Sequence, residues 1–254
     1  MVEGGPHARA SHLLYLWIQD ALNVACTATH TAATTIASQQ ATEAGELDAF
    51  LAALNYMGSR RIKLPEESVK SPDGSFWPTP APCPSIIFLV AMSQSWDSVL
   101  EEAEIYLTNL YPALVRVVVL KMCHKAPDRV VRGGDVRIAA VECVVAEDDD
   151  EGGGPTLRGR VVLDRFIQKD GQMCHNTSTE DLDLIFALAD FAHRNDRTRV
   201  ARLGKVVRLP FVKLQALVRE IEHIFADDSP IDTNLGPEKY PGLRIKPNLQ
   251  RPAS

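Results

Sequence analysis

The amino-acid sequence predicts an α/β fold in which a mixed central sheet is flanked by helices. Two runs, residues 86–92 and 114–122, are largely apolar and rich in β-branched side chains, which is typical of strands buried on both faces. Residues 96–110 between them place their apolar side chains along one side of a helix. Strand, helix and strand in this order are typical of a β-α-β unit, so we expect the two strands to be central neighbours.

An N-terminal helical segment is expected over residues 11–56. A broad apolar stripe runs through residues 12–26, and residues 46–56 return to helical spacing, with Gly58 placed to cap the helix end. Residues 27–42 are rich in Ala and Thr and contain no Asp, Glu, Lys or Arg. Such a run is better suited to packing against another helix than to a free surface.

Turn signals and strand patterns alternate in the middle of the chain. Residues 71–77 combine turn residues with a short strand, and residues 79–84 hold three prolines and must form a loop. Residues 136–145 and 160–167 alternate polar and apolar side chains and are expected to form an antiparallel pair. The acidic, glycine-rich residues 147–154 between them are expected to form a mobile hairpin loop.

The last part of the core is predicted to contain a helix, a short strand and a closing helix. Residues 181–193 are expected to be helical, with Ser178, Thr179 and Glu180 as cap residues. Residues 206–209 are expected to form the strand and residues 212–225 the final helix. Residues 230–254 hold five prolines and little apolar periodicity, so we expect a tail.

These patterns divide the 254 residues into three parts. Residues 1–58 form a helical segment packed on the core, residues 59–226 form the α/β core, and residues 227–254 form a proline-rich C-terminal tail. Hydrophobic residues make up 45% of the chain, which is enough to bury a sizeable core.

Composition also limits the classes of partner. The formal net charge is -6, whereas proteins that bind nucleic acids usually carry a basic excess, because they neutralise phosphates. We therefore expect a protein partner or self-association, without excluding nucleic acid. Residues 1–10 lack the pattern of a signal peptide and no stretch is long enough to span a bilayer, so we expect a cytoplasmic or nuclear protein with no membrane partner.

The five cysteines do not indicate a metal or redox site. No two have the CxxC spacing of a zinc ribbon. Cys123 and Cys143 lie in strand-like runs and are expected to be small buried hydrophobes. Cys123 and His124 are adjacent and would point to opposite faces of a strand, so they do not form a catalytic dyad.

A series of short motifs follows one order through the middle of the chain. They are Pro72-Asp73-Gly74-Ser75-Phe76, Pro84-Ser85, Val90 with Ser93-Gln94-Ser95, Trp96-Asp97-Ser98 with Glu102, Ala103 and Leu107, and the strand from Val117 to Lys121. This series resembles the PD-(D/E)XK superfamily of restriction-endonuclease-like domains, in particular a group of uncharacterised members common in fungal genomes. Residues 206–211 resemble the short strand before a closing helix in the same group. The resemblance implies a restriction-endonuclease-like mixed central sheet flanked by helices.

The resemblance also implies a metal-dependent nuclease site, and this chain departs from it. In such a site two carboxylates on neighbouring strands hold Mg²⁺, and a lysine or glutamine orients the attacking water. Asp73 matches the first carboxylate. The second carboxylate position falls on Leu89 and the lysine position on Ala91, and neither side chain can bind a cation or orient water.

Residues elsewhere could compensate for these losses. Glu102 is the candidate second metal ligand beside Asp73, with Glu101 and Glu104 on the same predicted helix as alternatives. Glu43 and Glu46 lie in the helical segment that often supplies an extra carboxylate in such folds. The candidate catalytic residues are then Asp73, Gln94 as a water-orienting group, and Lys121.

Each candidate also has a structural interpretation. Asp73 precedes Gly74, where an aspartate commonly caps its own backbone in a turn. The three helix glutamates are expected to form a solvated face, and the residues around Gln94 to cap the helix. Lys121 ends a strand and is expected to face solvent.

Three functions from different classes follow. The first is a catalytically degenerate nuclease-like domain that acts as a binding or scaffold module, for protein in preference to DNA, with no cofactor expected. The second is an active Mg-dependent nuclease that uses Asp73 and a migrated carboxylate. The third is an oligomeric scaffold that associates through its N-terminal helices and its C-terminal tail.

Overall fold

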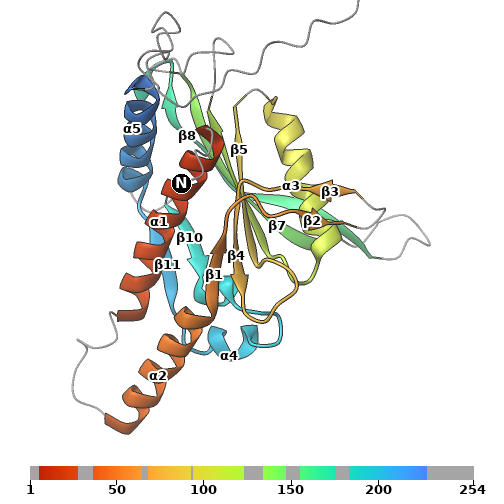
Figure 1. Cartoon of the computed structure of the whole chain (residues 1–254), viewed down its shortest axis with the longest axis vertical. Coiled ribbons are helices and arrows are strands. Elements are labelled where there is room, and N and C mark those ends of the chain that lie inside the picture. The colour runs from red at the N-terminus through yellow and green to blue at the C-terminus, as the bar shows by residue number, and fades with distance from the viewer. Residues whose placement is uncertain are drawn as a thin grey trace, which may run out of the picture.

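The computed structural model describes residues 6–27, 37–64, 68–92, 94–122, 134–146, 155–175 and 183–227. The elements are α1 (Pro6–Thr27), α2 (Ala37–Ala53), β1 (Leu54–Met57), β2 (Ile62–Lys63), β3 (Val69–Lys70), β4 (Gly74–Pro78), β5 (Ile86–Ala91), α3 (Trp96–Leu110), β6 (Arg116–Met122), β7 (Val136–Ala146), β8 (Thr156–Lys169), β9 (Gln172–Met173), β10 (Leu184–Ala187), the 3-10 helix η3 (Leu188–Phe191), α4 (Arg197–Ala201), β11 (Val206–Leu209) and α5 (Phe211–Asp227). Together they form a mixed α/β fold with flanking helices (Figure 1).

The central sheet has seven strands in the order β1-β4-β5-β6-β7-β8-β9. Only β5 and β6 pair in parallel, and the other neighbours are antiparallel. Two short pairs, β10 with β11 and β2 with β3, lie outside this sheet. The expectation of a mixed central sheet flanked by helices is confirmed.

The β5–α3–β6 unit lies at the centre of the sheet, as the sequence predicts. All six residues of β5 are buried, and Ile86 is paired with Arg116 at the start of the parallel register. Helix α3 begins where Ser95 caps it, because the Ser95 hydroxyl accepts the backbone N–H of Ser98 at 3.1 Å. The predicted antiparallel pairing of residues 136–145 with residues 160–167 is also confirmed, as β7 and β8.

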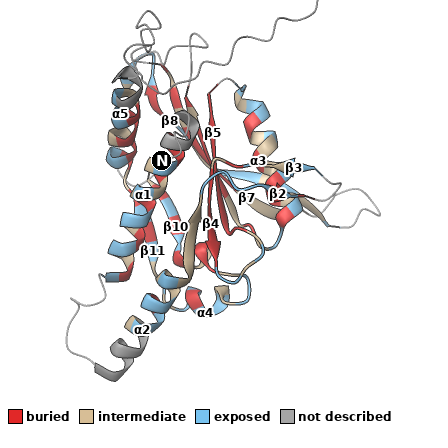
Figure 2. Ribbon diagram, in the orientation of Figure 1, coloured by how far each residue is buried: buried red, intermediate tan, exposed pale blue. Residues whose placement is uncertain are grey.

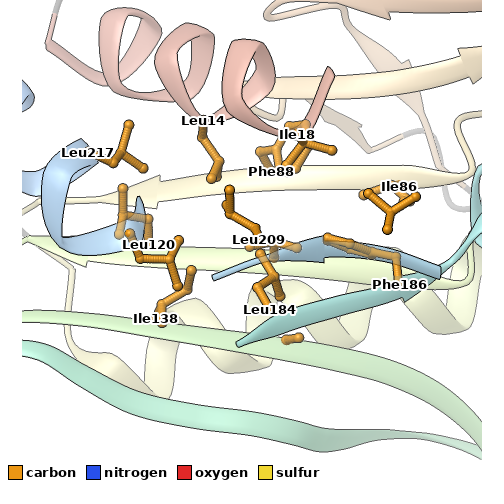
Figure 3. Close-up of a cluster of buried hydrophobic side chains, with 14 of the residues drawn as sticks. Leu14, Ile18, Ile86, Phe88, Leu120, Ile138, Leu184, Phe186, Leu209 and Leu217 are labelled. Carbon is orange, nitrogen blue, oxygen red and sulfur yellow. The ribbon is translucent and has the colours of Figure 1, made fainter. Parts of the chain in front are cut away.

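One face of the sheet is covered by α1, α5 and the β10–β11 pair. Figure 3 shows Leu14 and Ile18 of α1 directed at Phe88 of β5, with Leu217 of α5 beside them. The side chains of β10 and β11 fill the same cluster, and Phe186 is fully buried. Each fully buried leucine or phenylalanine contributes about 1.5–3 kcal/mol relative to an exposed one.

The other face of the sheet is covered by α3 and the β2–β3 pair. Val99, Ala103 and Leu107 of α3 pack against Leu89 of β5 and its neighbours. Because successive side chains of a strand point to opposite faces, β5 contributes to both clusters. Figure 2 shows the buried residues concentrated along these central strands, with exposed residues on the outer sides of the helices.

The N-terminal helical segment ends earlier than expected. Residues 54–56 continue the helical spacing of apolar side chains, but the chain leaves α2 at Ala53 and Leu54–Met57 form strand β1. This strand pairs with β4, so that Tyr56 lies opposite Phe76. Pairing with the sheet edge overrides the local helical pattern. The prediction that Gly58 caps a helix is wrong for the same reason.

The predicted helix over residues 181–193 is also wrong. Its described part forms β10 and the short 3-10 helix η3 instead. In β10 the buried and exposed residues alternate, with Leu184 and Phe186 buried and Ile185 exposed. The strand pairs with β11, where Leu184 lies opposite Leu209, and this distant partner decides between strand and helix.

Several expectations fall outside the described residues. They concern the acidic loop at residues 147–154, the tail at residues 230–254, most of residues 27–42, the cap residues 178–180, and Ser93, Cys123 and His124.

Gly74 is required where α1 meets the sheet. The Ser11 hydroxyl of α1 and the Tyr56 hydroxyl of β1 form a hydrogen bond of 3.1 Å, and Tyr56 stacks on Tyr15 with ring centroids 3.9 Å apart. A Cβ atom at residue 74 would collide with both hydroxyl oxygens. Any larger residue there must displace α1 or Tyr56.

We therefore expect Gly74→Ala to lower the free energy of unfolding by about 1–3 kcal/mol, the usual range for overpacking. The measurement is chemical denaturation followed by circular dichroism. Gly45→Ala in α2 is the matched control, since a Cβ there meets no atom within 4 Å. In a helix this control should be neutral or stabilising by about 0.5–1 kcal/mol. Equal effects of the two variants would contradict the packing argument.

Candidate functional site

Asp73 lies immediately before β4 and binds the neighbouring strand with both its backbone and its side chain. Its N–H donates to the carbonyl oxygen of Phe88 at 3.1 Å, and its Oδ2 accepts the N–H of Val90 at 2.7 Å. The carboxylate thus fixes the start of β4 against β5. This contact gives Asp73 a structural role, in addition to the cap of its own turn that the sequence predicts.

Leu89 and Ala91 occupy the positions where the resemblance implies a carboxylate and a lysine. Gly74 is paired with Phe88, so the extended register brings residue 73 opposite Leu89. Leu89 is only 5% exposed and Ala91 only 1%. Both belong to the apolar cluster under α3. The predicted burial of Leu89 is confirmed.

A cavity of about 340 Å³ gathers three of the four candidate residues. Asp73, Gln94 and Glu102 line it, together with Leu89 and Ser71, and its remaining walls are Val90 and Met92. Glu102 enters from α3, one turn beyond the helix start. The structure therefore brings Asp73 near the candidate second carboxylate, although 29 residues separate them in the sequence.

Glu102 is already engaged by two neighbouring side chains, of which Gln94 lines the cavity and Lys70 does not. Lys70 of β3 forms an ion pair of 3.3 Å with Oε1, and the side-chain amide of Gln94 donates to Oε2 at 3.2 Å. The Lys70 and Glu102 side chains are 31% and 24% exposed. Glu102 is therefore half-buried and paired, in contrast to the solvated residue that its helical position suggested.

Lys121 lies beyond this cavity, on the next strand. It is paired with Ala91 in the parallel β5–β6 register, so it shares the face on which the resemblance implies a lysine. Its Nζ donates to the carbonyl oxygen of Met92 at 2.7 Å, and the residue is half-buried. The expectation that Lys121 faces solvent is wrong.

Tyr106 is a residue near the site that sequence reasoning missed. It lies one turn after Glu102 on α3 and is fully buried, and among the described residues its hydroxyl has no hydrogen-bond partner. Burial raises the pKa of this phenol well above its ordinary value, and the negative charges of Glu102 and Asp73 raise it further. In the sequence, the only sign of its place near the site is the four-residue spacing from Glu102, which puts both side chains on one side of a helix.

The other glutamates considered as metal ligands lie away from the cavity lining. Glu101 is exposed, and Glu46 is exposed on α2. Glu104 accepts the backbone N–H of Gly159 on β8 at 2.8 Å. The side chain of Glu43 falls outside the described residues.

The cavity as arranged does not fit a preformed Mg²⁺ site. Among the described residues, no group of three or more His, Cys, Asp or Glu side chains is placed to hold a metal ion. Mg²⁺ can bind through one or two carboxylates with several waters. Here Oδ2 of Asp73 serves the Val90 N–H, and both oxygens of Glu102 serve Lys70 and Gln94. A cation would have to break at least part of this network.

Comparisons of the chain with protein-family models, with curated proteins and with solved structures found no match. In the part of the chain that the structure describes, no helix combines the length and apolar character needed to cross a membrane.

Tyr106→Phe tests whether the unpartnered hydroxyl weakens the fold. Because the change removes a buried polar group that lacks a partner, we expect the free energy of unfolding at neutral pH to rise by about 1 kcal/mol. In the native protein burial raises the pKa of the Tyr106 phenol. Above pH 10.0, the ordinary pKa, the unfolded chain therefore loses this proton first, and the free energy of unfolding falls as the pH rises further. The variant should lose less stability between neutral and alkaline pH. An identical alkaline loss in both proteins would contradict this assignment.

Proposed function

We propose that this chain is a catalytically degenerate nuclease-like domain that acts as a binding or scaffold module, for protein rather than nucleic acid. The observation that carries the proposal is the burial of Leu89 and Ala91 under α3, at the two positions where the resemblance implies the second carboxylate and the lysine. An apolar strand at this point cannot supply a hard oxygen ligand to a cation.

The restriction-endonuclease-like part of the proposal is supported by the arrangement of the motifs. The turn with Asp73, the buried β5, the helix α3 and the strand β6 follow one another and pack together. Asp73 lies next to β5 in the position implied for a first carboxylate. Its role here is to accept a backbone N–H, which a metal-free domain also needs.

The protein-binding part of the proposal is supported by charge. The chain carries a net charge of -6, and two carboxylates, those of Asp73 and Glu102, line the cavity, while Lys70 is engaged in an ion pair with Glu102. Phosphate backbones are attracted by clustered cations. A cavity of this composition attracts them poorly.

The second candidate function is an active Mg-dependent nuclease with migrated groups. It is favoured by one observation: Asp73, Glu102 and Gln94 share one cavity. Lys121, opposite Ala91, would supply from the neighbouring strand the lysine that the nuclease site needs at residue 91. This candidate requires that Glu102 exchange Lys70 for a metal ion.

A cleavage assay separates the two candidates. We expect the native protein to leave single- and double-stranded DNA intact in the presence of Mg²⁺ or Mn²⁺, and calorimetry to detect no binding of either metal. We expect Leu89→Glu alone to remain inactive, because a water-orienting group at residue 91 is still missing. Cleavage by the native protein that Asp73→Ala abolishes would establish the migrated site instead. The double variant Leu89→Glu with Ala91→Lys shows whether the frame can still support the chemistry.

The role of Asp73 can be tested without any ligand. Asp73→Ala should lower the free energy of unfolding by about 1.5–3 kcal/mol, because the Val90 N–H loses a charged acceptor. Asp73→Asn should cost less, because the amide oxygen can still accept that hydrogen bond. Chemical denaturation measures both values. If neither substitution changed the stability, Asp73 would not be the structural acceptor described above.

A further inference from the structure

A mostly apolar groove lies between α1 and the β11–α5 segment. It encloses about 440 Å³, and Trp17, Ala21 and Val24 of α1 face Val206 and Leu209 of β11 across it. Figure 1 shows α1 running beside β11 and α5 on one side of the sheet. This groove is separate from the Asp73 cavity, with which it shares no lining residue.

Large apolar side chains are exposed in and around this groove. Val24 is 66% exposed and Val206 is 53% exposed, and both line it. Val212, in the first turn of α5, is 67% exposed. Single exposed apolar residues are ordinary, but a group of them beside an apolar groove is typical of an interaction surface.

The charges in the groove have opposite signs on its two sides. Arg208 of β11 also lines it and pairs with Asp183 at 3.5 Å, and the other charged residues of the lining are Asp20 on α1 and Lys213 on α5. Neither of these two forms an ion pair with any residue that the structure describes, and the Lys213 ammonium lies 4.9 Å from the centre of the Trp17 ring. A twofold interface needs a surface that is complementary to itself, and a groove whose two charges without an ion pair, Asp20 and Lys213, lie on opposite sides meets that requirement.

The sequence that follows α1 lacks acidic residues, lysine and arginine over a long run. Helix α1 ends at Thr27, three residues after Val24, and residues 27–42 contain no Asp, Glu, Lys or Arg. A run of this length without acidic residues, lysine or arginine is better suited to packing against a protein surface than to a free surface.

We propose that this groove binds a second copy of the chain in a twofold dimer. The valines of the two grooves pack together, and Asp20 of each copy faces Lys213 of the other. The proposal specifies the self-association within the proposed scaffold function. It depends on neither Asp73 nor any nuclease chemistry, so the DNA cleavage assay and the dimer test can fail independently.

Analytical ultracentrifugation of the full chain tests the proposal. The expected mass is twice the 27.9 kDa of one chain. Val24→Glu combined with Val206→Glu should give a monomer with an unchanged circular dichroism spectrum, which shows that the variant is folded. Val69→Glu is the matched control, because Val69 is a 57% exposed valine on β3, on the other side of the sheet, and this variant should stay dimeric. A native protein that is monomeric at every soluble concentration, which would leave the groove to a different protein, overturns the proposal.

Charge reversal tests the pairing itself. Asp20→Lys alone or Lys213→Glu alone places like charges together across the twofold and should raise the dimer Kd by about tenfold or more. The double variant Asp20→Lys with Lys213→Glu restores opposite charges and should return the Kd close to the native value. A dimer that ignores both single reversals, or one that the double variant does not rescue, overturns the proposed arrangement.

Discussion

The burial of β5 on both faces is the constraint on which the rest of the structure depends. One set of its side chains packs under α1 and α5, and the alternate set packs under α3. A carboxylate at residue 89 would enter the second cluster without a cation, where it would cost several kcal/mol or take up a proton. The same packing that stabilises the core therefore keeps residue 89 apolar, the position where the resemblance implies a carboxylate.

This constraint also explains why the remaining polar groups are paired. All six side chains of β5 are apolar and buried, so this strand offers neither a metal ligand nor a charged partner to a carboxylate on α3. Glu102 instead finds Lys70 on β3 and Gln94 before α3. Asp73 uses one oxygen to hold β4 against β5. Half-buried carboxylates require such partners, and here protein donors supply them.

Elements defined by local periodicity could be predicted from the sequence. The continuous apolar run of β5 and the one-sided pattern of α3 each specify one structure, so the β5–α3–β6 unit matches the prediction. The β10 strand does not: Leu184-Ile185-Phe186 fits a helix or a strand equally well, and its partner β11 lies about twenty residues later. In β1 the apolar spacing continues that of α2, and only the edge of β4 decides the outcome.

The candidate site, like the fold, could be predicted from the sequence only in part. Asp73, Gln94 and Glu102 could be named because each belongs to a motif in the resemblance, and the fold does bring them into one cavity. Lys70 could not be named, since its contact with Glu102 depends on how β3 folds back against α3. Tyr106 was hidden because a tyrosine on the buried side of a helix is ordinary core until its hydroxyl is known to lack a partner.

The two surfaces of interest lie on opposite sides of one rigid sheet. The Asp73 cavity opens on the α3 side, and the groove between α1 and β11 opens on the other. Two copies joined through their grooves would therefore present two cavities facing away from the interface. An apolar residue 89 is compatible with such a dimer, because the proposed association uses the groove between α1 and β11 and needs no bound cation.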